Sequence, residues 1–99
     1  MIIEIVKGKE ETVLMISGRL DTNTASVLEK TIREDIRENA TLVLDMKELE
    51  YISSAGLRIL KLVYMALRKK DGELAIRDAN KLVMEVFEMT GFAGLLTFI

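Results

Sequence analysis

The segment Thr41-Leu42-Val43-Leu44-Asp45-Met46 decides the fold of this chain. A strand with apolar side chains on both of its faces is normally central in a sheet and covered on both sides. A loop over residues 47–52 follows it, and apolar side chains then recur at helical spacing. These side chains are Leu57, Leu60, Tyr64 and Leu67. A buried strand, a loop and an amphipathic helix in this order are the repeating unit of an α/β sheet.

Two short strands joined by a polar turn are predicted before this unit. Residues 2–6 and 12–17 are rich in branched apolar side chains, and the turn between them contains Gly8. Strands connected so briefly form an antiparallel hairpin. A loop over 18–24 then leads into a helix that exits near Asn39. Its inward face is formed by Ala25, Leu28, Ile32 and Ile36.

A further strand and helix are predicted after the central unit. The strand covers residues 73–77, and the helix that follows ends at Gly91. Its inward face is formed by Val83, Val86, Phe87 and Thr90. Residues 95–99 predict an edge strand or a docked tail. Because helices connect the strands over 12–17, 41–46 and 73–77, these three strands should be parallel. The sequence therefore predicts a single α/β domain over residues 1–99, with a mixed β-sheet, an N-terminal hairpin and repeated strand–helix units.

The composition excludes several classes of function. The 99 residues are 49% hydrophobic and 30% charged, which is typical of a globular protein. Cysteine and histidine are both absent. Disulfides, zinc sites of the Cys/His kind, Cys nucleophiles and Ser-His triads are therefore impossible. We expect no enzyme, no cofactor and no metal.

Net charge and hydropathy limit the kinds of partner and the cellular location that we expect. The net charge is −2, so no basic excess exists that would attract nucleic acid. No apolar run approaches the ~20 residues of a membrane span, and we expect no membrane insertion. The N-terminus lacks the basic flank and cleavage site of a signal peptide, which favours a cytoplasmic location.

Three polar loops are predicted to meet at one edge of the sheet. Sites in open α/β sheets lie at the carboxyl ends of the parallel strands. The loops over 18–24, 45–54 and 78–80 leave those ends. They carry the polar residues Asp21, Thr22, Asn23, Asp45, Ser53, Ser54, Asp78 and Asn80. We predict that this edge is the functional face.

The segment Ser53-Ser54-Ala55-Gly56 allows two interpretations. A serine at a helix start often serves as an N-cap and nothing more. A hydroxyl at that position can also be phosphorylated, because the helix dipole favours a phosphate there. Such a phosphate would add surface charge without refolding the helix. Asp21 likewise could simply cap its helix. Met65, Met84 and Met89 suit core or interface packing.

Several segments together resemble a known family. Gly18-Arg19-Leu20-Asp21-Thr22 is similar to the Gly-x-Leu-Asp segment of the STAS domain, and Leu44-Asp45-Met46 with residues 51–57 is similar to its central strand and phosphorylation loop. Phe87-Glu88-Met89-Thr90-Gly91-Phe92 resembles its closing Thr-Gly signature. The resemblance covers nearly the whole chain in order, and the bacterial anti-sigma factor antagonists are the closest soluble members of the STAS family.

The resemblance implies a partner-switching function. The chain would bind an anti-sigma factor that is itself a serine kinase, and thereby release a sigma factor. The kinase would phosphorylate Ser54, with Ser53 as the alternative acceptor, and a PP2C-type serine phosphatase would reset the switch. The implied partner-binding residues are Asp21, Thr22, Asn23, Ser53, Ser54, Gly56 and Arg58.

Two other functions remain open from the sequence. The first is a STAS-like adaptor or regulatory subunit of a membrane transporter complex, because such adaptors share the fold. The second is a nucleotide-binding module, although no Walker-type phosphate loop is present.

Overall fold

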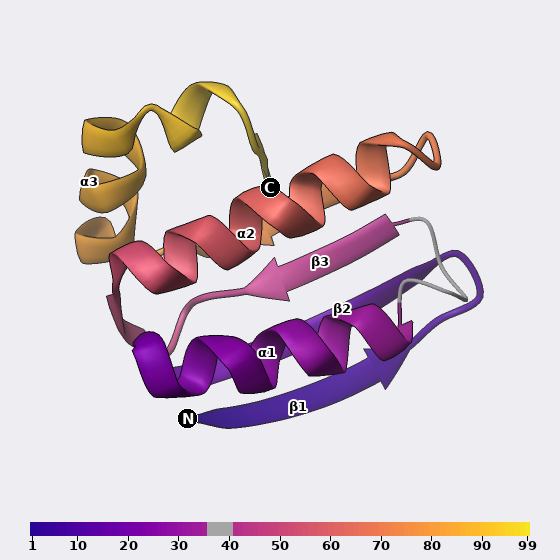
Figure 1. Cartoon of the computed structure of the whole chain (residues 1–99), viewed down its shortest axis with the longest axis horizontal. Helices are drawn as coiled ribbons and strands as arrows, with labels where there is room; N and C mark the ends of the chain where they lie inside the picture. The colour runs from indigo at the N-terminus through magenta and orange to yellow at the C-terminus, as the bar shows by residue number, and fades with distance from the viewer. Residues whose placement is uncertain (36–40) are drawn as a thin grey trace.

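A computed structural model describes residues 1–35 and 41–99 of the chain. Its strands are β1 (Ile2–Lys7), β2 (Glu11–Leu20), β3 (Thr41–Asp45), β4 (Leu49–Ile52), β5 (Glu73–Arg77) and β6 (Thr97–Phe98). Its helices are α1 (Thr22–Asp35), α2 (Ser54–Arg68) and α3 (Lys81–Thr90), followed by a 3₁₀ turn over Phe92–Gly94 (Figure 1). Ile36 and Asn39, assigned above to the first helix and its exit, lie outside the described residues.

The sheet is mixed, as predicted. Its strand order is β1-β2-β3-β5-β6, and β1 pairs with β2 in the antiparallel sense of a hairpin. The neighbours β2, β3 and β5 are parallel to one another. The C-terminal residues form an edge strand, since β6 pairs in parallel with β5. The predicted fold class and strand directions are therefore confirmed.

The main difference from the sequence prediction is β4. Residues 47–52 were expected to be a loop, but Leu49–Ile52 form a strand that pairs in parallel with the end of β2. The register of β2 shifts between Gly18 and Arg19, where Gly18 has the left-handed φ of 89°. Glycine adopts this conformation without strain. The extra pairing extends β2 to Leu20, three residues beyond the predicted strand end.

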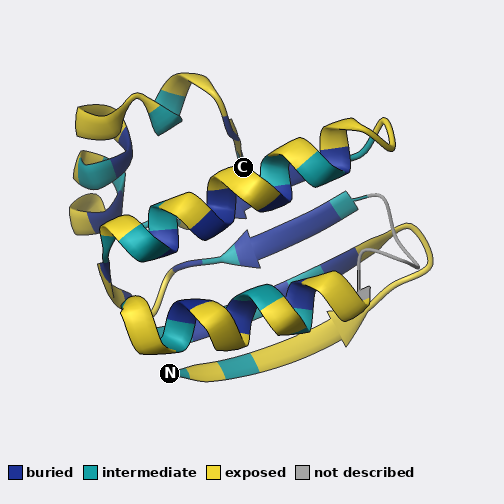
Figure 2. Ribbon diagram, viewed as in Figure 1, coloured by how far each residue is buried: buried dark blue, intermediate teal, exposed yellow. Residues whose placement is uncertain are grey.

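The core lies between the sheet and the helices α1 and α2, which cover the same face of the sheet (Figures 1 and 2). Leu14, Leu44 and Ile76 lie in one row across β2, β3 and β5, and all three are fully buried. Burying Leu or Ile side chains of this kind contributes about 1.5–3 kcal/mol each. This row is the centre of the apolar layer on which the helices pack.

The helices bury slightly different faces from those predicted. The buried residues of α2 are Gly56, Ile59, Leu60, Val63 and Leu67, whereas Leu57 and Tyr64 are half-buried. On α3, Val83 and Phe87 are buried and Val86 is half-buried.

The sequence also predicted Thr90 as an inward residue, and Met65, Met84 and Met89 as core or interface residues. Thr90 is exposed, and its hydroxyl donates a hydrogen bond to the Val86 carbonyl (2.8 Å). Met84 is half-buried and packs against the core. Met65 and Met89 are 49% and 86% exposed, so neither is a core residue.

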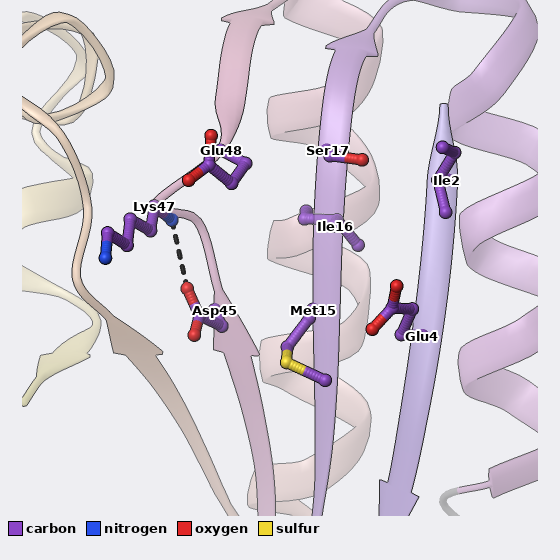
Figure 3. Close-up of a pocket in the computed structure, with 8 residues that line it drawn as sticks. All are labelled: Ile2, Glu4, Met15, Ile16, Ser17, Asp45, Lys47 and Glu48. Atoms are coloured by element: carbon purple, nitrogen blue, oxygen red, sulfur yellow. Dashed lines mark hydrogen bonds between the residues drawn. The ribbon is translucent and has the colours of Figure 1, made fainter.

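The opposite face of the sheet carries a row in which three of four residues are charged. In Figure 3 the helices lie behind the strands, and Glu4, Met15 and Asp45 lie on neighbouring strands in front of them. Arg77 continues the row on β5 and donates from Nη2 to Asp45 Oδ2 (2.9 Å). A groove of about 270 Å³ beside this row is also lined by Ile2 and Lys47.

The Asp45–Arg77 ion pair predicts a pH-dependent stability. Partial burial raises the pKa of Asp45, but the backbone N–H of Lys47 (3.0 Å) and the Arg77 guanidinium outweigh it and lower the pKa below its usual range. The resulting stability is present above the unfolded-state pKa of about 3.9 and is lost as the pH falls through the lower folded-state pKa. Asp45→Asn should cost about 1 kcal/mol of unfolding free energy at neutral pH.

Urea unfolding at several pH values tests this. The difference in unfolding free energy between wild type and Asp45→Asn should disappear as the pH falls below about 4. Glu88→Gln, which changes an exposed carboxylate on α3, should stay within about 0.5 kcal/mol of wild type. A gap that is the same at every pH would show that the carboxylate charge contributes nothing.

Candidate functional site

Two helices begin side by side at the carboxyl edge of the sheet. The last paired residues of β2 and β4 are Leu20 and Ile52. The pairing continues by one hydrogen bond, because the backbone N–H of Ser53 donates to the Leu20 carbonyl (2.8 Å). Asp21 and Ser53 therefore follow neighbouring strands, and α1 and α2 start directly after them. The first N–H groups of both helices, which have no partner within their own helix, therefore lie at this edge.

Asp21 caps α1. Its Oδ1 accepts hydrogen bonds from the backbone N–H groups of Asn23 (3.0 Å) and Thr24 (3.1 Å), and Thr24 Oγ1 in turn accepts from the Asp21 N–H (2.8 Å). The Thr24 backbone bond is the main cause of the lowered pKa of Asp21. The other bonds from Thr24 and Asn23 and the charge of Arg19 lower it further, against a partial offset by desolvation. The capping interpretation of Asp21 is confirmed, and its carboxylate is a fixed negative charge beside the start of α2.

Ser53 and Ser54 have different roles in the helix start. Ser53 is the N-cap of α2, since its Oγ accepts the Gly56 N–H (3.2 Å) and its carbonyl accepts the Leu57 N–H (3.0 Å). Ser54 is the first residue of α2 and is exposed. Among the described residues, no hydrogen bond of the Ser54 hydroxyl is found. The cap thus occupies one serine and leaves the hydroxyl of the next one in solvent.

Gly56 is buried, which changes its role. A Cβ at this position would lie 2.8 Å from Leu20 Cγ and 3.1 Å from Ile52 Cγ1. Gly56 was expected among the partner-binding residues, but it lies against the ends of β2 and β4 instead of on the surface. Its lack of a side chain lets the first turn of α2 approach the sheet closely.

The other predicted contact residues lie at the surface. Thr22 and Asn23 are exposed in the first turn of α1. Arg58 is exposed on α2, one helical turn after Ser54. The structure therefore places the predicted partner-binding residues at this edge of the sheet and on the first turns of α1 and α2. Gly56 is the exception, because it is buried.

The sequence analysis missed a cation–π pair beside the site. The Arg19 guanidinium carbon lies 4.1 Å from the centroid of the Tyr51 ring, and the two residues pair across β2 and β4. Cation–π contacts at exposed positions contribute about 0.5–1 kcal/mol. Nothing local in the sequence indicates this pair, because it exists only when β4 lies beside β2.

The third predicted loop does not join the site. Asp45 ends β3 opposite Met15, five residues before Leu20, and a strand rises about 3.3 Å per residue. The end of β3 is thus about 16 Å from the helix starts along the sheet. Asn80 caps α3 through the Val83 N–H (3.0 Å), and its amide donates to the carbonyl of Leu49 (2.6 Å), at the beginning of β4. Asp78 directly follows Arg77, which ends β5 opposite Asp45. The structure therefore separates Asp45, Asp78 and Asn80 from Ser54.

Residues 1–35 and 41–99 contain no group of three or more acidic, Cys or His side chains placed to hold a metal ion. None of the described helices is both long and apolar enough to cross a membrane.

Comparison with known proteins identifies the family. The family model described as "Mlab, STAS domain" matches residues 3–97. The chain therefore belongs to the STAS domain family, as its motifs suggested.

Two relatives place it more narrowly within that family. BtrV of Bordetella bronchiseptica, which is named as an anti-sigma factor antagonist, is 37% identical over 81% of this chain and 70% of its own length. The anti-sigma F factor antagonist of Paenibacillus polymyxa is 30% identical over 95% of this chain and 82% of its own. This chain is a member of the anti-sigma factor antagonists.

The solved structures of SpoIIAA, a Bacillus anti-sigma factor antagonist, have the same fold. The unphosphorylated form superposes with a TM-score of 0.87 at 17% identity, covering 99% of this chain and 88% of SpoIIAA. The phosphorylated form superposes with a TM-score of 0.79 at 16% identity, covering 99% and 91%. At this level of identity the likeness concerns the fold alone.

Proposed function

We propose that this chain binds an anti-sigma factor with serine kinase activity, and that phosphorylation of Ser54 dissociates the complex. In the unmodified state the chain holds the anti-sigma factor and a sigma factor is released. A PP2C-type phosphatase restores the unmodified state. The chain acts in the cytoplasm and performs no catalytic step itself.

The proposal rests on the different structural roles of Ser53 and Ser54. Ser53 holds the helix start through its Oγ, while the Ser54 hydroxyl is exposed and outside the cap. A phosphate on Ser54 therefore adds about −1.5 to −2 charges at the start of α2 without removing the hydrogen bond that maintains the helix. The α2 dipole favours that charge.

The comparisons support the same proposal. SpoIIAA has been solved in unphosphorylated and phosphorylated forms. Both forms superpose on this chain, so an antagonist of this fold exists in both states. A switch that changes surface charge and leaves the scaffold in place is what an exposed serine at a capped helix start permits.

A phosphorylation assay tests the site. The purified anti-sigma factor from the source cell is incubated with this chain and ATP, and the product is analysed by intact-mass and peptide mass spectrometry. Wild type should gain one phosphate, on the peptide that contains Ser54, and Ser54→Ala should gain none.

Ser53→Ala is the matched control. It should still gain the phosphate, although loss of the cap should cost about 1 kcal/mol of stability, which urea unfolding monitors. A phosphate found on Ser53, or an unchanged mass for wild type, would contradict the proposed site.

A further inference from the structure

The exposed side of α2 carries a continuous stripe that begins at Ser54. Residues three and four apart lie on the same side of a helix. Ser54, Arg58, Lys61, Leu62 and Met65 follow this spacing, and all five are exposed. We refer to these five residues as the α2 stripe. The buried residues of α2 lie on the opposite side of the helix and face the sheet.

The α2 stripe is cationic in an acidic protein. The chain has a net charge of −2, yet the 15 residues of α2 contain no Asp or Glu. Arg58 and Lys61 are exposed within the stripe, and Arg68 is exposed at the end of the helix. The local charge is thus opposite to that of the whole molecule, which favours a partner surface with acidic side chains.

The same stripe exposes apolar area. Leu62 and Met65 are each 49% exposed. Leu62 also lines a groove of about 270 Å³ between α1 and α2, together with Ile32, Val63 and Ala66. Glu29 and Arg33 also line this groove, and they form an ion pair with each other (3.0 Å). The groove is thus apolar, and the exposed cations Arg58 and Lys61 lie on the same stripe as Leu62. This combination suits an apolar side chain of a partner that is flanked by carboxylates.

We infer that the α2 stripe is the docking surface for an acidic, apolar segment of the anti-sigma factor. This inference rests on the proposed function and assigns a surface to its partner. Arg58 and Lys61 face carboxylates of that segment, and an apolar side chain enters the groove beside Leu62. A phosphate on Ser54 lies one turn before Arg58, at the spacing of an intrahelical ion pair, and therefore competes with the partner for that guanidinium.

The size of a protein interface agrees with this assignment. A rise of 1.5 Å per residue places Met65 about 16 Å from Ser54 along α2. A standard interface covers about 800 Å² on each partner, which corresponds to a radius of about 16 Å. A footprint centred on Ser54 therefore reaches the end of the stripe. The switch residue then lies on the same surface as the apolar contacts that hold the partner.

Two matched pairs of variants test the inference in the full chain, with binding to the purified anti-sigma factor measured by calorimetry. Leu62→Asp on α2 is paired with Leu82→Asp on α3, where Leu82 is 55% exposed. Lys61→Glu is paired with Lys81→Glu, also exposed on α3. We expect Leu62→Asp to weaken binding at least tenfold and Lys61→Glu several-fold, with the Lys61 effect shrinking at high salt. Both α3 variants should bind like wild type.

The outcomes separate this inference from the proposed function. If wild type binds, Ser54→Asp does not, and both α2 variants bind like their α3 controls, the inference is wrong and the proposed function stands. If wild type does not bind the anti-sigma factor, the proposed function itself fails. Flotation of wild type with phosphatidylglycerol vesicles, lost in Leu62→Asp while anti-sigma factor binding is unchanged, would assign the stripe to a membrane and overturn the inference.

Discussion

Replacing Ser54 by Asp should weaken binding of the anti-sigma factor roughly a hundredfold. One unit charge about 6 Å from an acidic partner group, at an effective dielectric constant of about 20, costs on the order of 3 kcal/mol before salt screening. That free energy corresponds to about a hundredfold in the dissociation constant. Phosphoserine carries more charge, so phosphorylated wild type should bind at least as weakly as Ser54→Asp.

The expected loss of binding in Ser54→Asp cannot be attributed to unfolding of the first turn of α2. An acidic side chain in the first turn of a helix is favoured by the dipole, and the Ser53 cap is unchanged. Ser54→Ala should bind within a few-fold of wild type, because it adds no charge. Thr97→Asp adds a carboxylate at an exposed residue of β6, and should also bind normally. Equal affinities for wild type and Ser54→Asp, measured by calorimetry at low salt, would remove the basis of the switch.

Replacing Gly56 by Ala should destabilise the fold by about 1–3 kcal/mol, the usual cost of overpacking a core. The new Cβ would lie 2.8 Å from Leu20 Cγ and 3.0 Å from its Cδ2. Leu20 is fully buried, and protein interiors are so closely packed that its side chain cannot move aside without cost. Ala is the better helix former and restricts the unfolded chain, but this gain of about 0.4–1 kcal/mol offsets only part of the clash.

A double-mutant cycle tests the cause of that loss by urea unfolding. Leu20→Ala alone should cost about 2–5 kcal/mol through the cavity that it leaves. The double variant should cost about 1 kcal/mol less than the sum, because the two changes occupy the same space. Gly94→Ala is the control, since its Cβ would meet nothing within 4 Å, and it should be close to neutral. Strict additivity of Gly56→Ala and Leu20→Ala would show that the contact does not limit this position.

The Gly56 substitution also connects packing with the switch. A first turn of α2 that moves away from Leu20 carries Ser54 with it, because the two residues belong to the same turn. Phosphorylation of Gly56→Ala by the anti-sigma factor should therefore be slower than that of wild type, even where the variant is still folded. Under the proposed function, the buried glycine would thus position the Ser54 hydroxyl without itself contacting the partner.

Much of the fold follows from local patterns in the sequence. Branched apolar residues with a turn between them predicted the hairpin, and the spacing of apolar residues predicted three helices, two of which connect parallel strands. β4 was not predicted, because its buried residues Leu49 and Ile52 are three apart, and two exposed residues lie between them. A strand as short as this has no periodicity of its own and forms because the end of β2 offers it a partner.

The sequence by itself determined the class of the fold, the absence of Cys and His chemistry, and the small polar segment that contains the proposed phosphorylation site. Only the tertiary structure decided that Ser53 is the cap and Ser54 the exposed hydroxyl, that Gly56 is buried, and that Asp45 is far from the site. The physical reason is that periodicity and capping propensity are properties of neighbours in the chain. Strand register and helix docking depend instead on contacts between distant residues, such as Leu20 with Ser53, which no local pattern records.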